Sequence, residues 1–243
     1  MKKFKIIIFS TIFIFVLINK AFAVNFSGAA TAYEITMTYL QLCESGSTAS
    51  TCLNPLVIGT GDSGPIDIAN TTAGAAAASY GDFKKVPFGK SYSYYQVTMK
   101  REITIAGSVS DGSNTCRTDG DNESNYSENI EGKTAGTASS VTVFMAFVST
   151  SLDSDVNSAT AADGSGTSRA AGTVTSGDGF LEKRGAFTQP IKLEAGRIPT
   201  LKLAFGTSSA LGYMGASGGC ATDGGAAQGL YGGKPDVTAT VAY

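Results

Sequence analysis

Histidine is absent from all 243 residues of this sequence. Its absence excludes the Ser-His-Asp and Cys-His catalytic triads and removes the commonest general base at neutral pH. An enzyme would have to use carboxylate, lysine or tyrosine chemistry, and no motif for such a site stands out. We therefore expect a protein that is not an enzyme.

Blocks of basic residues are also missing. No run of lysine and arginine is longer than a pair such as Lys84-Lys85 or Lys183-Arg184. Residues 1–23 hold four lysines and no acid, so the rest of the chain has 18 − 4 = 14 basic and 20 acidic residues, a net charge of about −6. Such a surface repels nucleic-acid phosphate, so nucleic acid is not an expected partner.

Long apolar runs are confined to the beginning of the chain. Three lysines precede an apolar run from Ile6 to Ile18, and Ala21-Phe22-Ala23 then provides a small-x-small cleavage site. This pattern predicts a bacterial signal peptide over residues 1–23, with a mature chain that begins at Val24. No second run follows, so we expect no transmembrane helix after cleavage. The expected location is extracellular or at the cell surface, with the periplasm as the alternative.

Cysteine is scarce, but its number is even. In the oxidising compartment of an exported chain, four cysteines predict two disulfides, for which three pairings exist. We predict that Cys43 pairs with Cys52, because these two bracket a polar loop typical of a hairpin end, and that Cys116 pairs with Cys220. A zinc site is the alternative, which the absence of both C-x-x-C spacing and histidine weakens.

Alternation of apolar and polar residues is the main structural signal. The pattern predicts one long strand over Tyr95–Ile105 with one solvated face. Arg101 lies on its apolar row, where we interpret it as a charge at a sheet edge or strand end; the alternative is a buried ion pair. Residues 33–39 and 237–243 alternate in the same way. Val141–Val148 is apolar on both faces, which predicts a central strand.

Several shorter elements complete the prediction. Pro190–Gly196 and Leu201–Phe205 surround a turn and predict a hairpin. A short helical turn is expected over Thr71–Tyr80, and the polar residues 110–137 and 149–172 are expected to be loops. Further short strands are expected over Leu56–Ile58, Ile66–Ile68 and Thr173–Thr175.

The sum of these signals predicts an all-β fold. Short strands with glycine-rich connections are typical of an antiparallel β-sandwich, immunoglobulin-like or jelly-roll-like, here stapled by disulfides, with long polar loops and at most one short helix. We expect residues 24–243 to form a single domain. A subdivision near residues 110–137 is the alternative.

One polar loop is a candidate metal site. Asp119, Asp121 and Glu123 could supply three carboxylates to a calcium ion. The match to an EF-hand fails, because Ser124 stands at the position of the turn glycine and Ile130 at that of the closing glutamate. A solvated polar loop is the alternative interpretation.

Three tyrosines near the start of the long predicted strand are candidate glycan contacts. Tyr92, Tyr94 and Tyr95 could stack on sugar rings if they are exposed. The alternative is cross-strand packing, which is the commoner role of tyrosine in strands.

The carboxyl-terminal segment carries a resemblance to a known family. Residues 229–236 form a Gly/Tyr turn with an Asp, and the alternating Val/Thr strand Val237–Tyr243 follows. This resembles the last strand of chaperone-usher pilus subunits, particularly the spore-coat-U-like group, over these residues alone. The resemblance implies association by strand addition. Added to a neighbour's open sheet edge, the strand would bind through main-chain hydrogen bonds, and the residues expected to mediate this are Val237, Ala239, Val241 and Tyr243.

Three functions remain open from the sequence. The first is an exported structural or interaction protein, such as a fimbria-like or filament subunit, whose partners are other protein subunits or copies of itself. The second is a secreted or periplasmic adhesin module that binds a glycan or calcium. The third is an outer-membrane β-barrel, because an aromatic terminal residue after an alternating strand also suits barrel insertion.

Overall fold

The computed structural model describes residues 24–70, 80–110, 112, 114–121, 128–145, 156–159, 161–166, 177–193, 199–215 and 229–242. These residues fold into antiparallel β-sheets, together with a short 3-10 segment, η1 (Phe83–Lys85). The all-β, antiparallel fold stapled by a disulfide is therefore confirmed. The predicted signal peptide over residues 1–23 lies outside the described residues, and strand β1 begins at Val24.

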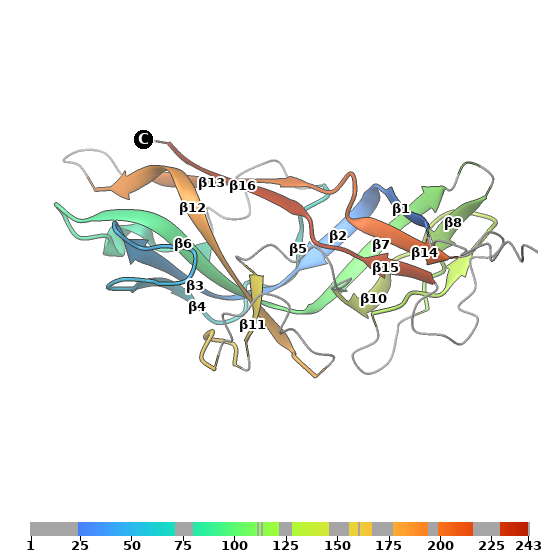
Figure 1. Cartoon of the computed structure of the whole chain (residues 1–243), viewed down its shortest axis with the longest axis horizontal. Coiled ribbons are helices and arrows are strands. Elements are labelled where there is room, and N and C mark those ends of the chain that lie inside the picture. The colour runs from blue at the N-terminus through green and yellow to red at the C-terminus, as the bar shows by residue number, and fades with distance from the viewer. Residues whose placement is uncertain are drawn as a thin grey trace, which may run out of the picture.

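The strands form two halves along an elongated molecule (Figure 1). In the first half, one sheet has the order β5-β2-β7-β8-β9, with β10 also pairing with β7, and a second sheet has the order β1-β14-β15. A first core of buried residues lies among these strands, including Tyr33, Ile105 and Leu211. The strands are β1 (Val24–Gly28), β2 (Ala30–Ile35), β5 (Ile66–Asp67), β7 (Glu102–Ser110), β8 (Thr115–Thr118), β9 (Gly132–Lys133), β10 (Val141–Phe144), β14 (Leu211–Gly215) and β15 (Gly229–Gly232).

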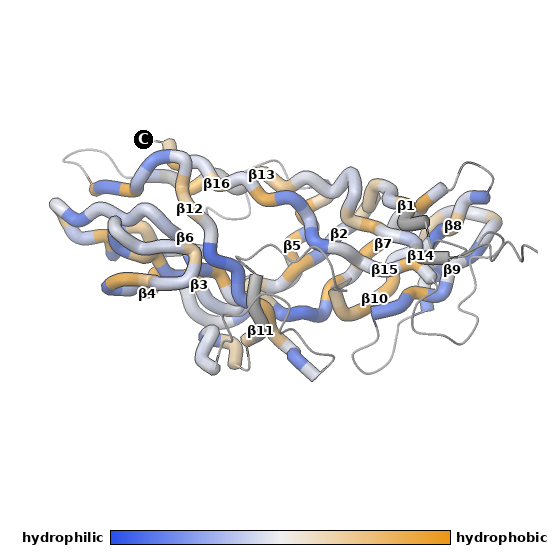
Figure 2. Tube along the Cα trace, in the orientation of Figure 1, coloured by the Kyte–Doolittle hydropathy of each residue, from blue (hydrophilic) through white to orange (hydrophobic). Residues whose placement is uncertain are grey.

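The second half places a large sheet against a small one. The large sheet has the order β11-β12-β6-β3-β4, and the small sheet consists of β13 and β16. A second core, which includes Leu42, Val97 and Leu201, lies among these strands, and Figure 2 shows hydrophobic residues in both halves. The strands are β3 (Met37–Glu44), β4 (Leu56–Thr60), β6 (Ser91–Lys100), β11 (Val156–Ala159), β12 (Phe180–Lys192), β13 (Thr200–Gly206) and β16 (Asp236–Ala242).

The two halves share strands that continue from one to the other. Strand β2 becomes β3 after Thr36, and β6 becomes β7 after Arg101. Strand β15 likewise leads into β16 through residues 233–235, as Figure 1 shows. The single domain stays a prediction. Three pairs of consecutive strands nevertheless run directly from one core to the other.

A β-bulge changes which residues of β3 face the core. Pairing with β6 shifts register between Met37 and Tyr39, so two residues of β3 oppose one of β6. Because side chains alternate along a strand, the extra residue reverses the faces. Met37 and Leu40 are therefore both buried in the second core, whereas Tyr39 is half-buried.

The long strand predicted over Tyr95–Ile105 is in fact two strands. Strand β6 ends at Lys100 and β7 begins at Glu102, and the two belong to different sheets. The prediction of a solvated face is also wrong at Gln96 and Thr98, because both residues are buried. The reason is nonlocal: other segments of the chain cover this face of the sheet.

The hairpin predicted over residues 190–205 is also wrong. Strand β12 pairs with β11 and β6, whereas β13 pairs with β16, so the two predicted arms lie in different sheets. Strand β10 alternates buried and half-buried residues beside β7 and is not buried on both faces. The expected loops contain strands, because β8 lies within residues 110–137 and β11 within 149–172.

Some of the remaining predicted elements are confirmed, and others lie outside the described residues. Strands β4, β5 and β16 confirm the short strands expected from Leu56, Ile66 and Val237. The strand expected over residues 173–175 and nearly all of the helical turn expected over 71–80 lie outside the described residues.

Candidate functional sites

The terminal strand β16 lies within its own chain, antiparallel to β13. Val237 opposes Phe205, Ala239 opposes Leu203 and Val241 opposes Leu201. Ala239 is buried in the second core, and Val237 and Val241 are half-buried against it. Tyr243 lies outside the described residues. The role of these four residues in association stays a prediction, and within the chain the first three attach the small sheet to the core.

Among the described residues, neither outer edge of the small sheet, that of β13 or that of β16, has a partner strand. No strand in the described part of the chain pairs with β13 except β16, so Thr200–Gly206 has one row of main-chain groups without a partner strand. This segment, Thr-Leu-Lys-Leu-Ala-Phe-Gly, is long and largely apolar. Its only charged residue is Lys202, and its residue Ala204 is exposed. Such an edge is suited to pairing with another strand.

An apolar pocket lies between the large and small sheets. Its walls come from both layers: Met37 and Val97 belong to the large sheet, and Leu201, Phe205 and Val237 to the small one. A second apolar pocket shares Phe205 and Val237 and extends towards Pro235.

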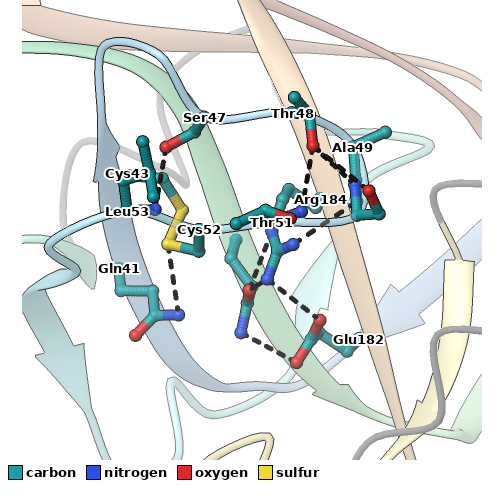
Figure 3. Close-up of polar contacts among 12 residues, drawn as sticks. Gln41, Cys43, Ser47, Thr48, Ala49, Thr51, Cys52, Leu53, Glu182 and Arg184 are labelled. Carbon is teal, nitrogen blue, oxygen red and sulfur yellow. Dashed lines mark hydrogen bonds and ion pairs between the residues drawn. A yellow bond between two sulfur atoms is a disulfide. The ribbon is translucent and has the colours of Figure 1, made fainter.

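The predicted disulfide between Cys43 and Cys52 is present, with the two Cα atoms 5.0 Å apart. It closes the loop between β3 and β4, as expected for a hairpin end. Within the loop, Ser47 Oγ donates to the Glu44 carbonyl oxygen at 2.6 Å and accepts from the Leu53 amide at 3.0 Å. Figure 3 shows this loop beside strand β12. Because these two cysteines are bonded to each other, they cannot serve as zinc ligands.

Cys116 is also disulfide-bonded, and none of the described cysteines is free. It is buried on β8 in the first core. Its predicted partner, Cys220, lies outside the described residues, so this pairing stays a prediction.

A buried polar cluster lies beneath the disulfide loop. Gln96 from β6 and Glu182 and Arg184 from β12 are all buried on the face of the large sheet that points away from the second core. Gln96 Nε2 donates to Glu182 at 2.7 Å, and Arg184 Nε donates to Gln96 Oε1 at 3.0 Å. Arg184 Nη1 reaches the carbonyl oxygen of Ala49 in the disulfide loop at 3.4 Å, as Figure 3 shows.

A second segment covers the same cluster. A Cβ atom added at Gly164 would lie 2.9 Å from both Glu182 Oε2 and Thr98 Oγ1, so only glycine fits this close approach. The segment is held to β3 by Thr38, whose hydroxyl donates to the Ala162 carbonyl oxygen at 2.7 Å. Sequence reasoning missed this cluster, because nothing in the local pattern of β6 or β12 indicates that distant segments cover them.

Arg101 lies between the end of β6 and the start of β7, so the expected place at a strand end is confirmed, but the side chain is fully buried and not at an open edge. The ion pair of the alternative is present, with a buried arginine and a half-buried partner. Its guanidinium pairs with Glu128, and its Nε donates to the Met145 carbonyl oxygen at 3.1 Å. The guanidinium also lies 5.8 Å from the ring centre of Phe144. Burial lowers the pKa of Arg101, against the opposing effect of the charge on Asp178.

The predicted calcium loop is only partly described. Asp119 Oδ1 accepts from the Asp121 amide at 3.0 Å, and the Asp121 side chain is exposed. Glu123 lies outside the described residues. Within the part of the chain that the structure covers, no three potential metal ligands gather. The calcium site therefore stays a prediction.

The tyrosines considered as glycan contacts mostly pack in the core. Tyr92 and Tyr95 are buried in the second core, and only Tyr94 is half-buried. The Tyr95 ring lies 5.4 Å from that of Phe187, centre to centre. The alternative interpretation, cross-strand packing, is confirmed for these two.

Comparisons with protein-family models, with curated proteins and with solved structures found no match to this chain. Among the described residues, no helix has the length and apolar character needed to cross a membrane.

Proposed function

We propose that this protein is an exported structural or interaction protein that acts at the cell surface or outside the cell and associates with other subunits, or with copies of itself, by β-strand addition. The site of addition is the open edge of β13. The observation that carries the proposal is the two-stranded layer over a five-stranded sheet, with an edge of β13 that no described strand pairs with and an apolar pocket between the two sheets.

Strand addition supplies both affinity and specificity at such a site. The incoming strand would pair with the main-chain groups along Thr200–Gly206, and its alternate side chains would enter the gap between the sheets. Leu201 and Phe205 line that gap from the edge strand itself. An apolar residue placed there would bury surface worth about 25 cal/mol per Å².

The predicted export and the disulfide agree with this proposal. A disulfide persists in an oxidising compartment, where assemblies at the cell surface form. The resemblance of residues 229–243 to the last strand of pilus subunits points to the same mode of association.

The test places a charge on the edge strand. Ala204 is exposed on β13, and Lys there should weaken pairing between edges, since lysine blunts exposed strands. The matched control is Thr238→Lys, because Thr238 is exposed and opposes Ala204 on β16, the strand on the opposite side of the small sheet from the proposed site of addition. Light scattering after size-exclusion chromatography would measure self-association, and negative-stain microscopy would reveal filaments.

We expect Ala204→Lys to raise the dissociation constant of self-association about fivefold, as like charges across strands do, and Thr238→Lys to leave it nearly unchanged. If association requires a different subunit, the same variants are compared in pull-down from the exported fraction. A mature protein that stays monomeric at high concentration and captures no subunit through β13 would contradict the proposal.

A further inference from the structure

Phe88 is the most exposed large hydrophobic residue in the described part of the chain, at 68 % exposure. It lies in the connection between η1 and β6, at the end of the molecule where β6 begins and β12 ends, because it bridges to Leu193 just beyond β12. Figure 1 shows this end at the left, away from the first half.

The backbone around Phe88 is anchored, so its exposure does not result from a loose loop. Phe83 and Val86 are both buried in the second core. The Asp82 side chain accepts a hydrogen bond from the Lys84 amide at 3.1 Å, and this cap begins η1. Gly89 has a positive φ of 78° and completes the turn into β6. These contacts hold the chain in place while the Phe88 ring points into solvent.

Four exposed lysines lie close to Phe88 in the sequence or through strand pairing. Lys84, Lys85 and Lys90 lie within four residues of Phe88 along the chain, and Lys192 opposes Ser91 at the end of β12. Figure 2 shows hydrophilic residues where β6 begins and β12 ends. We call Phe88 with these four lysines the basic tip. It holds 4 of the 14 basic residues found after residue 23, in a chain whose net charge there is negative.

The acidic residues near the basic tip already have partners. Glu44 accepts from Lys90 Nζ at 2.6 Å and from Asn54 at 2.6 Å, and the hydrogen bond to Lys90 lowers the pKa of Glu44. Asp82 is engaged in its cap. Four lysines and two described carboxylates leave 4 − 2 = +2 at this end. Glu194 lies outside the described residues.

We propose that the basic tip binds an anionic lipid bilayer, with the Phe88 ring entering the headgroup region and the lysines contacting lipid phosphates. An exposed ring flanked by lysines matches both layers of such a surface, because apolar groups enter the acyl boundary while charges stay at the phosphates. Each lysine near an anionic surface contributes about 1 kcal/mol. A soluble polyanion would satisfy the lysines but would leave the ring in water.

This inference is independent of the proposed function, because the basic tip and the edge of β13 use different residues. The tip would hold one end of an exported subunit at a membrane surface and leave the open edge free to pair.

The test uses the mature protein and sedimented vesicles of two compositions, phosphatidylcholine alone and phosphatidylcholine with one quarter phosphatidylglycerol. Phe88→Ala removes the ring. Its matched control is Leu53→Ala, which removes the other exposed large hydrophobic residue, 42 % exposed, from the disulfide loop. Lys85→Gln removes one charge from the tip, and Lys100→Gln removes one exposed charge elsewhere.

We expect binding to the anionic vesicles only, weakened by salt. Phe88→Ala should lower the partition coefficient about tenfold, since burial of most of a Phe side chain contributes 1.5 kcal/mol or more. Lys85→Gln should lower it about fivefold. The two controls should bind like the unaltered protein. Equal binding to both vesicles, or unchanged binding by Phe88→Ala, would overturn the proposal. Equal affinity for heparin without dependence on Phe88 would instead identify a site for soluble polyanions and would also overturn it.

Discussion

The Tyr33 hydroxyl donates a hydrogen bond of 2.8 Å to the carbonyl oxygen of Gly233, a residue 200 positions away in the sequence. Tyr33 is fully buried on β2, and Gly233 lies in the connection between β15 and β16. Burial raises the pKa of Tyr33, so the hydroxyl stays protonated and remains a donor at any physiological pH. The bond joins an early strand to the connection through which the last strand enters the second half.

Tyr33→Phe should therefore cost about 1 to 2 kcal/mol of unfolding free energy, because the ring still fills the core while the Gly233 carbonyl loses its donor. Tyr80→Phe is the matched control. The Tyr80 hydroxyl donates to the Gly61 carbonyl oxygen at 2.7 Å in an exposed position, where water can replace it. Urea denaturation should show a cost below about 0.5 kcal/mol for this control. Equal costs in the two variants would contradict the structural role given to Tyr33.

Arg101→Met should be among the most destabilising single changes in the chain. It leaves the buried carbonyl oxygen of Met145 without its side-chain donor and Glu128 without its cation. The buried acceptor left without its donor costs about 1 to 3 kcal/mol, whereas the Glu128 side chain, 34 % exposed, can be solvated. Lys100→Met, which breaks an exposed pair with Asp62, should cost less than about 1 kcal/mol. Thermal denaturation of both variants would decide, and similar melting temperatures would show that Arg101 does not stabilise the junction.

Gly164→Ala should disturb the buried polar cluster directly. Its φ is 77°, and the new methyl group would meet Glu182 Oε2 and Thr98 Oγ1 at 2.9 Å. Gly61→Ala shares the positive φ, at 85°, but meets no atom within 4 Å. The control should therefore lose only the backbone cost of about 1 kcal/mol, and Gly164→Ala about 1 to 3 kcal/mol more. Equal losses on denaturant unfolding would mean that the segment around Gly164 does not cover the cluster closely.

Asp67 makes the stability of the fold depend on pH in the acid range. Its burial alone would raise its pKa, but hydrogen bonds from the Asn70 side chain and from the amides of Tyr33, Ala69 and Asn70 outweigh this and lower it below 3.8. Because the pKa of Asp67 is lower in the folded state, its ionised carboxylate stabilises the fold at pH values above its unfolded pKa of 3.8. This stabilisation is lost as the pH falls through the folded pKa.

Asp67→Asn should accordingly destabilise the fold at pH 7, and this cost should shrink as the pH is lowered towards 2 and the native carboxyl takes up its proton. Unfolding free energies of both proteins, measured between these two pH values, provide the check. A difference that stays constant over this range would show that the carboxylate charge has no part in the stabilisation.

The two disulfides should differ in their contribution to stability. Replacement of Cys43 and Cys52 by Ser frees a loop of about ten residues and should cost about 2.7 kcal/mol on the chain-entropy account. It also releases the loop whose Ala49 carbonyl accepts from Arg184. If Cys116 pairs with Cys220, the closed loop holds about 105 residues, and its loss should cost about 4.7 kcal/mol. Non-reducing peptide mapping should recover a linked peptide of Cys116 and Cys220, and free thiols at either position would contradict the pairing.

Local alternation was sufficient to predict much of the β-structure. It located β4, β5 and β16 and predicted the all-β class, because a strand with one buried face repeats every two residues. The disulfide of the β3–β4 loop followed from the polar residues between its cysteines. These features depend on neighbours in sequence.

The features that were missed depend on contacts between distant segments. The burial of Arg184 requires the loop around Ala49 and the segment around Gly164 to cover one face of β12, and no pattern within β12 records this. The break at Arg101 likewise requires Glu128 and Met145 from elsewhere in the chain. The hairpin error has the same origin, since the proximity of β12 and β13 in sequence says nothing of the two sheets into which they separate.

The strands shared by the two halves also have a mechanical consequence. Strand β1 lies at one end of the molecule, the described chain finishes near the other, and β2–β3 and β6–β7 run between these ends (Figure 1). A pulling force along this axis would act on continuous covalent backbone at the junction, and neighbouring strands would resist it by shearing many hydrogen bonds at once. The two halves would therefore bear tension along this axis together.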